Sequence, residues 1–394
     1  MRIAMVSEHV GPQAGDTAQG VHVAELSAVL SKLGHEVTVY TRREGPGLPE
    51  RIRADGGYDV VHVTAGPARR LGVEDVVPHL GAFAEALAEE WERRPPDVVH
   101  AHRWTAGLAA VIGAHRAEVP LVHSCHGLAP RPGHRTGQDS AWPRRAETEA
   151  LLARTASRII AAGSSEVSEL CRLGAQRARI SVVPGGVDLE LFHPDGPVAE
   201  RGPLRRVLAV GELVPRNGYH EIITAMSTMD DAELVIVGDS PRADPATDQL
   251  HALIDESEMR KRVVCTGAVP RGEMPALLRS ADVVVCAPWR EPLGTVALEA
   301  MACGVPVVAT EVGVLPDIVL HQVTGLHVLP RNVRALTRAL RSLLANETQR
   351  EQFGIAGRDR VVARYSWDRL AREFLSGYQH TAALGSRHDV AHDG

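Results

Sequence analysis

Two carboxylates stand close together in an otherwise apolar stretch of the sequence, "WREPLGTVALEAMACGVPVVAT" at 289–310. Glu291 precedes a Leu-Gly-Thr turn, and Glu299 follows it in the early turns of a predicted helix. A buried carboxylate without partners is strongly destabilising, so each side chain needs a reason to be there. Glu299 can accept two hydrogen bonds from vicinal hydroxyls, as on a ribose, and Glu291 can do the same for a sugar ring.

The turn between these carboxylates is suited to an anion. A helix that opens near Leu293 to Thr295 has free N–H groups and a positive dipole end, and Gly294 lets a phosphate approach the backbone. In a plainer interpretation, Glu291 is a charge at a helix N-terminus and Glu299 is a solvated surface residue. The spacing alone leaves both interpretations open.

Short β-branched apolar runs alternate with helical patterns along the chain, which is typical of buried parallel strands joined by crossover helices. The sequence therefore predicts an α/β protein with two Rossmann-like doubly wound parallel sheets facing a central cleft. The predicted strands lie at 2–8, 35–41, 58–63, 96–102, 120–127, 158–164 and 180–188, then at 205–213, 232–239, 262–267, 281–288, 305–310 and 324–330.

The pattern also predicts domain boundaries. A stretch rich in Pro, Gly and charge indicates a linker. An amphipathic helix follows the second sheet, and the last residues lack periodicity. The predicted parts are an N-terminal domain at 1–190, a linker at 191–206, a C-terminal domain at 207–364, a final helix at 365–380 and a frayed tail at 381–394.

Composition excludes several classes of partner. The formal charge of −6 without a basic face argues against nucleic acid. The five cysteines show neither metal spacing nor a disulfide framework, and no apolar run approaches the length of a membrane span. We therefore expect a cytoplasmic protein with no membrane signal, no metal and no cofactor. A homodimer is one arrangement that the sequence leaves open.

The carboxylate segment resembles the E-P-F-G-x-x-x-x-E-A-M-A-x-G-x-P-V-V-A-T motif of retaining nucleotide-sugar glycosyltransferases of family GT4, which have the GT-B fold. Further matching segments appear in family order over nearly the whole chain. They include "GHEVTVYT" from Gly34, "DVVHAHRWTAGLAA" from Asp97, "HSCHG" from His123, "VVPGGVDLELFHP" from Val182, "ADVVVCAPWREP" from Ala281 and "YSWDRLA" from Tyr365. In that family the C-terminal domain holds the donor, and the final helix crosses back onto the acceptor-binding N-terminal domain.

The resemblance implies roles for particular residues. Glu291 would contact donor-sugar hydroxyls and Glu299 the ribose. The backbone N–H groups of Leu293, Gly294 and Thr295 would bind the phosphates. Val269 would lie near the base. His126, in "HSCHG", would face the donor sugar near the reacting carbon, whereas His100, His102 and His123 are interpreted as ordinary buried histidines.

The sequence departs from the family pattern where the donor diphosphate should be bound. Glu212 and Asn217 occupy the places of the expected Arg and Lys. At a separation of about 4 Å, a carboxylate and a phosphate oxygen repel each other by roughly 4 kcal/mol when the effective dielectric constant is about 20. Either Arg216 or Arg290 substitutes as the cation, or the donor carries no ordinary diphosphate, or turnover is lost.

Two glycine motifs also differ. Thr17 and Ala18 stand where the family has Gly-Gly, and Gly20 could allow the close approach to the donor instead. The family's G-G-x-P-E appears as 313–317, "GVLPD", with one glycine lost and the Glu shortened. The basic segment 131–145 either holds an anionic acceptor or is a solvated loop.

These features together predict a retaining, metal-independent glycosyltransferase. It would move a sugar from a UDP- or GDP-linked donor to a small polar acceptor, such as an aminocyclitol of a secondary-metabolite or antibiotic pathway. The acceptor's proton would pass to the departing diphosphate, with no side-chain nucleophile. Two alternatives remain: a glycoside phosphorylase on the same scaffold, and a non-catalytic binding protein.

Overall fold

The computed structural model describes residues 1–8, 17–129, 144–239, 245–257 and 259–390, and the side chains of these except at 245–247 and 384–390. The chain divides into two compact units. Unit 1 comprises Met1–Pro184 with Trp367–Gly394, and unit 2 comprises Gly185–Ser366. No helix in the described part of the chain is long and apolar enough to cross a membrane.

Unit 1 is built on a sheet that has eight strands among the described residues, in the order β3-β4-β2-β1-β5-β6-β7-β8. Its pairs are parallel except for β3 with β4. The strands are β1 (Arg2–Val6), β2 (Glu36–Arg42), β3 (Arg51–Arg53), β4 (Asp59–Val63), β5 (Val98–His102), β6 (Leu121–Ser124), β7 (Arg158–Ala161) and β8 (Ile180–Val182).

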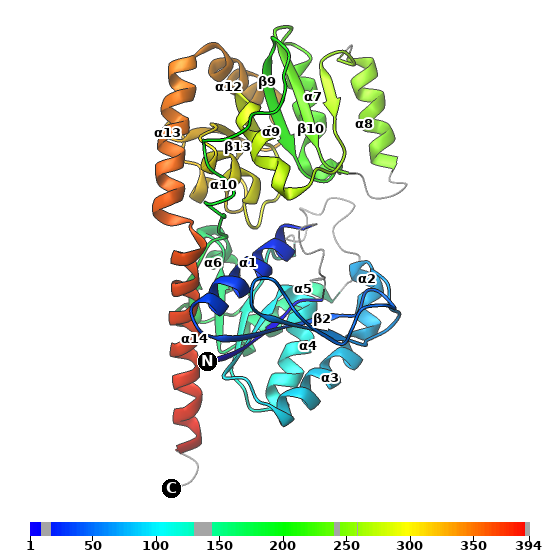
Figure 1. Cartoon of the computed structure of the whole chain (residues 1–394), viewed down its shortest axis with the longest axis vertical. Helices are drawn as coiled ribbons and strands as arrows, with labels where there is room; N and C mark the ends of the chain where they lie inside the picture. Colours follow the sequence, from blue (N-terminus) through cyan, green and yellow to red (C-terminus); the bar gives the residue numbers. More distant parts are fainter. Residues whose placement is uncertain (9–16, 130–143, 240–244, 258, 391–394) are drawn as a thin grey trace. The chain divides into compact units, whose positions relative to one another are not determined.

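Helices cover both faces of this sheet (Figure 1). Ile3 and Met5 pack in a cluster with α1 and α14, whereas Ala4 and Val6 pack in another with α3 and α4. Successive side chains of a strand point to opposite faces, so one apolar strand supplies two cores. The helices are α1 (Ala18–Lys32), α2 (Val73–Val76), α3 (Leu80–Arg93), α4 (Arg103–Arg116), α5 (Arg145–Thr155), α6 (Ser164–Arg172) and α14 (Trp367–Val390).

Unit 2 has a parallel sheet of six strands in its described part, in the order β11-β10-β9-β12-β13-β14. The strands are β9 (Arg205–Val210), β10 (Ala232–Val237), β11 (Val263–Cys265), β12 (Val283–Cys286), β13 (Val307–Thr310) and β14 (Gly325–Val328). The helices are α7 (Tyr219–Met226), α8 (Pro245–Glu256), α9 (Met274–Ser280), α10 (Thr295–Ala302), α11 (Leu315–Ile318), α12 (Val333–Ala345) and α13 (Glu347–Arg364). The predicted α/β class with two parallel sheets is confirmed.

The end of the chain differs from the prediction. Helix α14 continues to Val390, so the predicted frayed tail is wrong for 381–390, and 391–394 lie outside the described residues. Thr381 is buried, and its hydroxyl accepts a hydrogen bond of 3.2 Å from Arg158 Nε on β7. This contact holds the helix against unit 1 beyond residue 380, the predicted end of the final helix.

The boundary between the units also lies elsewhere than predicted. Unit 1 ends at Pro184 and not at residue 190, and β9 already begins at Arg205, inside the predicted linker 191–206. The charge-rich composition placed Arg205 and Arg206 in the linker, although the predicted strand 205–213 already began at Arg205, as β9 does. Both pair with acidic side chains of unit 2, which allows charged residues to begin a strand.

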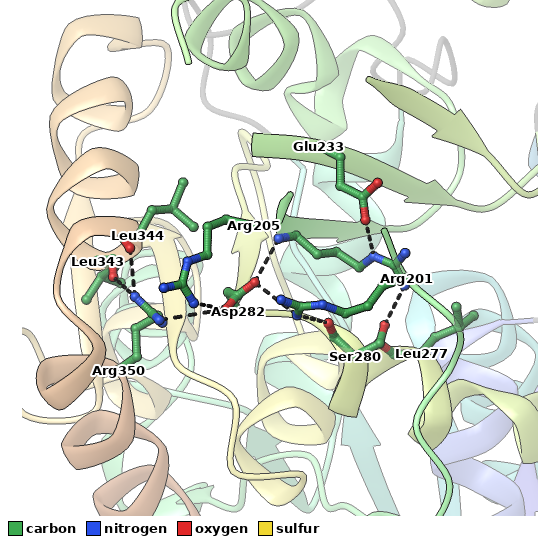
Figure 2. Close-up of polar contacts among 10 residues, drawn as sticks. Arg201, Arg205, Glu233, Leu277, Ser280, Asp282, Leu343, Leu344 and Arg350 are labelled. Atoms are coloured by element: carbon green, nitrogen blue, oxygen red, sulfur yellow. Dashed lines mark hydrogen bonds and ion pairs between the residues drawn. The ribbon is translucent and has the colours of Figure 1, made fainter. Parts of the chain in front are cut away.

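A charge network lies at the amino ends of β9 and β12, the sheet edge opposite to the strands' carboxyl ends. Asp282 accepts the Arg206 backbone N–H at 2.8 Å and pairs with Arg201 at 3.0 Å and Arg205 at 3.2 Å. Arg350 of α13 lies 3.7 Å from the same carboxylate, and Figure 2 shows these side chains converging on Asp282. The largely buried carboxylate of Asp282 thereby joins two strands and a helix.

Replacing Asp282 with Ala should lower the free energy of unfolding of unit 2 by about 3–5 kcal/mol, because the buried Arg350 guanidinium loses its counter-ion. Urea denaturation followed by circular dichroism measures this. Asp255→Ala is the matched control, since Asp255 pairs with Arg260 on the exposed surface and its loss should leave the midpoint unchanged. Equal midpoints for the Asp282 variant and the wild type would contradict a structural role for this network.

Candidate functional site

Glu291 lies after β12, in the segment that leads into α10. Its Oε1 accepts the backbone N–H of Leu293 at 3.1 Å and of Gly294 at 2.8 Å. No hydrogen bond to Oε2 occurs within the part of the chain that the structure describes. Burial raises the pKa of Glu291, and the two N–H groups offset part of this effect. One carboxylate oxygen is therefore fixed by the protein, and the other is available to a ligand.

This geometry changes the predicted phosphate contacts. The N–H groups of Leu293 and Gly294 donate to Glu291, so they are not free as the resemblance implied. Helix α10 begins at Thr295, and Gly294 precedes it in the left-handed conformation, with φ of 69°, and provides no side-chain cap. The first N–H groups of a helix have no partner within the helix, so the anion-binding donors begin at Thr295.

Gly313 holds the backbone of Glu291 in place. The Val314 N–H donates to the Glu291 carbonyl at 3.0 Å, and a Cβ on Gly313 would lie only 1.8 Å from that oxygen. Gly313 also has a positive φ of 56°, whereas Val314 has φ of −90°. Of the two glycines in the family motif, the one retained is thus the one that this close approach requires. The loss of the second does not disturb the backbone.

Glu299 lies in α10 and is buried. Its Oε1 accepts from Arg271 Nη1 at 2.6 Å, and the Arg271 guanidinium also lies 5.0 Å from the centroid of the Phe192 ring. The interpretation of Glu299 as a solvated residue is therefore wrong. The sequence reasoning missed Arg271, although it stands two residues after Val269 in the segment that was already singled out.

Val269 lies after β11 and is half-buried. The preceding Ala268 N–H donates to Asp239 Oδ1 at 3.0 Å, which ties this segment to the residues that follow β10. The ion pair of Arg271 with Glu299 ties it to α10 as well. The structure therefore brings Val269 and Glu299 to the same edge of the unit 2 sheet, and the contact of Val269 with a base stays a prediction.

The charge reversal at Glu212 is partly compensated. Arg216 Nη2 lies 2.9 Å from Glu212 Oε2, and both side chains are about half exposed. Asn217 does not point away from this turn, because its Nδ2 donates to the Glu212 backbone oxygen at 2.7 Å. Arg290, the other proposed substitute, is exposed. The charge of Glu212 is thus neutralised by Arg216, the residue that was proposed to take the place of the family's phosphate-binding Arg and Lys.

His126 lies just after β6, in unit 1. It is not a glycine, yet it has a positive φ of 49°, and its Nε2 lies 2.8 Å from His102 Nδ1 at the end of β5. Burial lowers the pKa of His126 well below its usual range, and the neighbouring His22 and His102 lower it further. The imidazole is therefore neutral at physiological pH.

Three histidines meet at this point. Nitrogen atoms of His22, His102 and His126 all lie within 4.8 Å of one another, a spacing that a metal ion can occupy. The sequence analysis expected no metal because the five cysteines lack metal spacing, and it did not name His22, on α1, as a candidate ligand. The metal-independent reaction stays a prediction.

Gly20 lies in the first turn of α1 and is buried. Its N–H donates at 3.0 Å to the hydroxyl of Thr17, which caps the helix from a position where the family has glycine. The contact of Gly20 with a donor stays a prediction. Of the basic segment, 131–143 lie outside the described residues, and Arg145 pairs with Glu149 at 2.7 Å.

Two family models match the chain. The model described as "Glycosyltransferase Family 4" matches residues 19–191, and the one described as "Glycosyl transferases group 1" matches 197–360. The D-inositol 3-phosphate glycosyltransferase of Xylanimonas cellulosilytica is 33% identical, with 96% of each chain covered. That of Kribbella flavida is 32% identical over 96% of this chain and 95% of its own.

Solved structures agree on the fold. Sucrose-phosphate synthase from Thermosynechococcus elongatus aligns with a TM-score of 0.90 and 26% identity over 97% of this chain and 99% of its own. Anabaena HepE, solved in complex with UDP and glucose, aligns with a TM-score of 0.78 at 19% identity over 96% and 100%. The chain is a glycosyltransferase of family GT4 with the GT-B fold.

Proposed function

We propose that the chain is a retaining, metal-independent glycosyltransferase that uses a UDP- or GDP-linked sugar as donor. One observation carries this proposal: Glu291 has one oxygen fixed by two N–H groups beside the uncapped start of α10. The other oxygen can accept hydrogen bonds from sugar hydroxyls, while the helix N-terminus binds the adjoining phosphate. A carboxylate next to an anion site suits a ligand that has both groups, as a nucleotide sugar does.

The proposed acceptor is a phosphorylated cyclitol. Relatives that cover 96% of this chain are named for D-inositol 3-phosphate, which makes this compound the first acceptor to test. It is a small polar acceptor of the predicted kind. An unphosphorylated aminocyclitol, which the sequence analysis suggested, is the second acceptor to test.

The proposed reaction needs no protein nucleophile. The bond between the anomeric carbon and the diphosphate oxygen breaks, and the acceptor oxygen bonds to the same face of that carbon. The departing diphosphate oxygen takes the acceptor's proton. The protein contributes by positioning: Glu291 orients the sugar, the α10 N–H groups from Thr295 onward stabilise the developing charge, and His126 is assigned to the sugar by its match to the family motif.

The test is a transfer assay after a binding screen. Calorimetry with UDP and with GDP selects the base, and mass spectrometry then detects transfer from a panel of sugars on that base to D-inositol 3-phosphate. Proton NMR of the product gives the anomeric configuration, and excess EDTA tests the metal requirement. An inverted product, or activity abolished by EDTA and restored by a divalent cation, would overturn the corresponding part of the proposal.

A non-catalytic binding protein is the second candidate, because Glu212 and Asn217 occupy the positions of the diphosphate clamp. The binding screen separates the two candidates. If neither UDP nor GDP binds, the non-catalytic alternative is favoured. A glycoside phosphorylase would instead release sugar 1-phosphate when the product is incubated with inorganic phosphate.

Restoring the family residues tests where the donor binds. The double variant Glu212→Arg, Asn217→Lys removes the carboxylate that pairs with Arg216 and adds two cations. We expect the UDP dissociation constant to fall by about 3- to 30-fold, measured by calorimetry, because charged hydrogen bonds to phosphate are gained. Glu212→Gln is the intermediate control, since it releases Arg216 without adding a cation. Weaker binding by the double variant would show that Glu212 helps to bind the donor.

A further inference from the structure

The topological switch point of the unit 2 sheet lies between β9 and β12. In the strand order β11-β10-β9-β12-β13-β14, the chain passes from β9 to β10 on one side and returns to β12 on the other side of β9. Open α/β sheets bind ligands at such a point, outside the carboxyl ends of the strands. The segment 211–218 follows β9 there, and the segment 287–294 follows β12 and leads into α10. Both segments belong to unit 2 and flank the position where a ligand is expected.

The two segments are joined directly through their backbones. The Trp289 N–H donates to the Arg216 carbonyl oxygen at 2.8 Å. Gly218 has a positive φ of 76°, and a Cβ on it would lie only 2.1 Å from the carbonyl oxygen of Ala287, so this close approach requires glycine. The backbone of Arg216 is therefore fixed beside the segment that carries Glu291.

The guanidinium of Arg216, in contrast to its backbone, is easily released. Its Nη2 lies 2.9 Å from Glu212 Oε2, and the two side chains are 52% and 59% exposed. An exposed ion pair contributes little to stability, so it can open at little cost. Bonds from a guanidinium to phosphate oxygens are charge-assisted and can be bidentate, so a diphosphate is a better partner than this carboxylate. Glu212 can then turn into solvent, where salt screens its charge.

Two other arginines near this edge of the sheet have close partners. Arg271 pairs at 2.6 Å with a buried carboxylate of α10, and the Arg331 guanidinium lies 3.9 Å from the centroid of the Trp289 ring. The sequence left the replacement cation open between Arg216 and Arg290, and both residues are exposed. The backbone contact across the switch point favours Arg216.

We propose that Arg216 binds the diphosphate of the donor and that Glu212 holds its guanidinium before the donor binds. Binding exchanges one ion pair for another: the contact between Arg216 and Glu212 opens, and Arg216 donates to phosphate oxygens. The diphosphate then lies between this guanidinium and the N-terminus of α10. The contact rests on the proposed function for the identity of its ligand, but it does not require that transfer occurs.

Arg216→Met tests the contact, with uridine as the reference ligand because it has no phosphate. We expect the dissociation constant for UDP, measured by calorimetry, to rise about 10- to 100-fold, and that for uridine to change less than about twofold. Arg216→Lys should recover part of the loss, because it keeps the charge without the bidentate geometry. If the protein binds GDP and not UDP, GDP and guanosine take the place of this ligand pair.

Arg260→Met is the matched control, since it also removes an arginine from an exposed ion pair of unit 2, with Asp255 at 2.7 Å. It should leave the dissociation constants for both ligands unchanged. Arg290→Met tests the competing candidate. If Arg290→Met weakens UDP binding and Arg216→Met does not, the proposal is overturned. Equal losses of UDP and uridine binding in Arg216→Met would show a structural role and would also overturn it.

Glu212→Gln tests the exchange of partners. It removes the charge that competes with the diphosphate, so the dissociation constant for UDP should fall about two- to fivefold while that for uridine stays the same. Unchanged or weaker UDP binding would overturn the holding role of Glu212.

The transfer assay separates this inference from the proposed function. If Arg216→Met weakens UDP binding as expected but the wild type transfers no sugar to any acceptor, the proposed function fails and the phosphate contact stands. If sugar is transferred and Arg216→Met keeps the wild-type kcat/KM for the donor, the inference is overturned and the proposed function stands.

Discussion

Glu291→Gln is expected to lower kcat about 100- to 1000-fold without unfolding the protein. The amide oxygen of Gln can still accept the N–H groups of Leu293 and Gly294, which the carboxylate holds at 3.1 and 2.8 Å. The amide nitrogen replaces the other oxygen and turns an acceptor into a donor. The substitution therefore removes only the contact proposed for the sugar hydroxyls, and steady-state kinetics with urea denaturation measures both effects.

Glu311→Gln is the control for this experiment. Glu311 follows β13, is exposed, and loses the same charge. It should leave both kcat and stability unchanged. If Glu291→Gln retains more than about a tenth of the wild-type kcat, Glu291 does not bind the reacting sugar and serves only to hold the turn before α10.

The pH dependence of the reaction should report on the same group. Burial raises the pKa of Glu291 above that of an ordinary glutamate. The ionised form accepts the sugar hydroxyls, so kcat/KM should fall on the acid side at a higher pH than for an exposed carboxylate, and Glu291→Gln should lack this limb. The effect on folding has the opposite sign. The folded protein binds the proton of Glu291 more tightly than the unfolded chain does. The stability that this protonation contributes is therefore fully present below the pKa of Glu291 in the unfolded chain, and it is lost as the pH rises through the pKa of Glu291 in the folded protein.

The second large effect is expected at Glu299. Glu299→Gln should raise the dissociation constant for UDP about 30- to 100-fold, because a carboxylate that accepts two ribose hydroxyls forms charge-assisted hydrogen bonds. Calorimetry with UDP measures it, or with GDP if that is the base bound. Uridine without phosphates should lose affinity by a similar factor, since the ribose is common to both ligands.

Arg271 supplies the alternative explanation, because it pairs with Glu299 at 2.6 Å. A double-mutant cycle of Glu299→Gln with Arg271→Met separates the two roles. If Glu299 binds the ribose, Arg271→Met should weaken UDP binding only a few-fold, and the double variant should bind about as weakly as Glu299→Gln. Equal loss of UDP binding and of melting temperature in both single variants would show that the pair is structural.

The sequence was sufficient for most of the strands and for naming the candidate residues, although it missed β3 (Arg51–Arg53). The run 305–310 is β-branched and apolar over the length of a strand, and the predicted strand is present as β13. The resemblance of 291–310 to the family motif identified Glu291 and Glu299. Local preferences of this kind act within a few residues along the chain, so they can be read without knowing the fold.

The tertiary structure decided which partners these residues have. Arg271 reaches Glu299 across 28 positions, His102 reaches His126 across 24, and Arg158 anchors Thr381 across 223. Tertiary geometry matters even for residues close in sequence: the dihedral angles of the turn direct the N–H groups of Leu293 and Gly294 to the Glu291 carboxylate. Hydrogen bonds and ion pairs depend on distances of about 3 Å and on direction, and only the packing of strands and helices sets these for residues far apart in the chain.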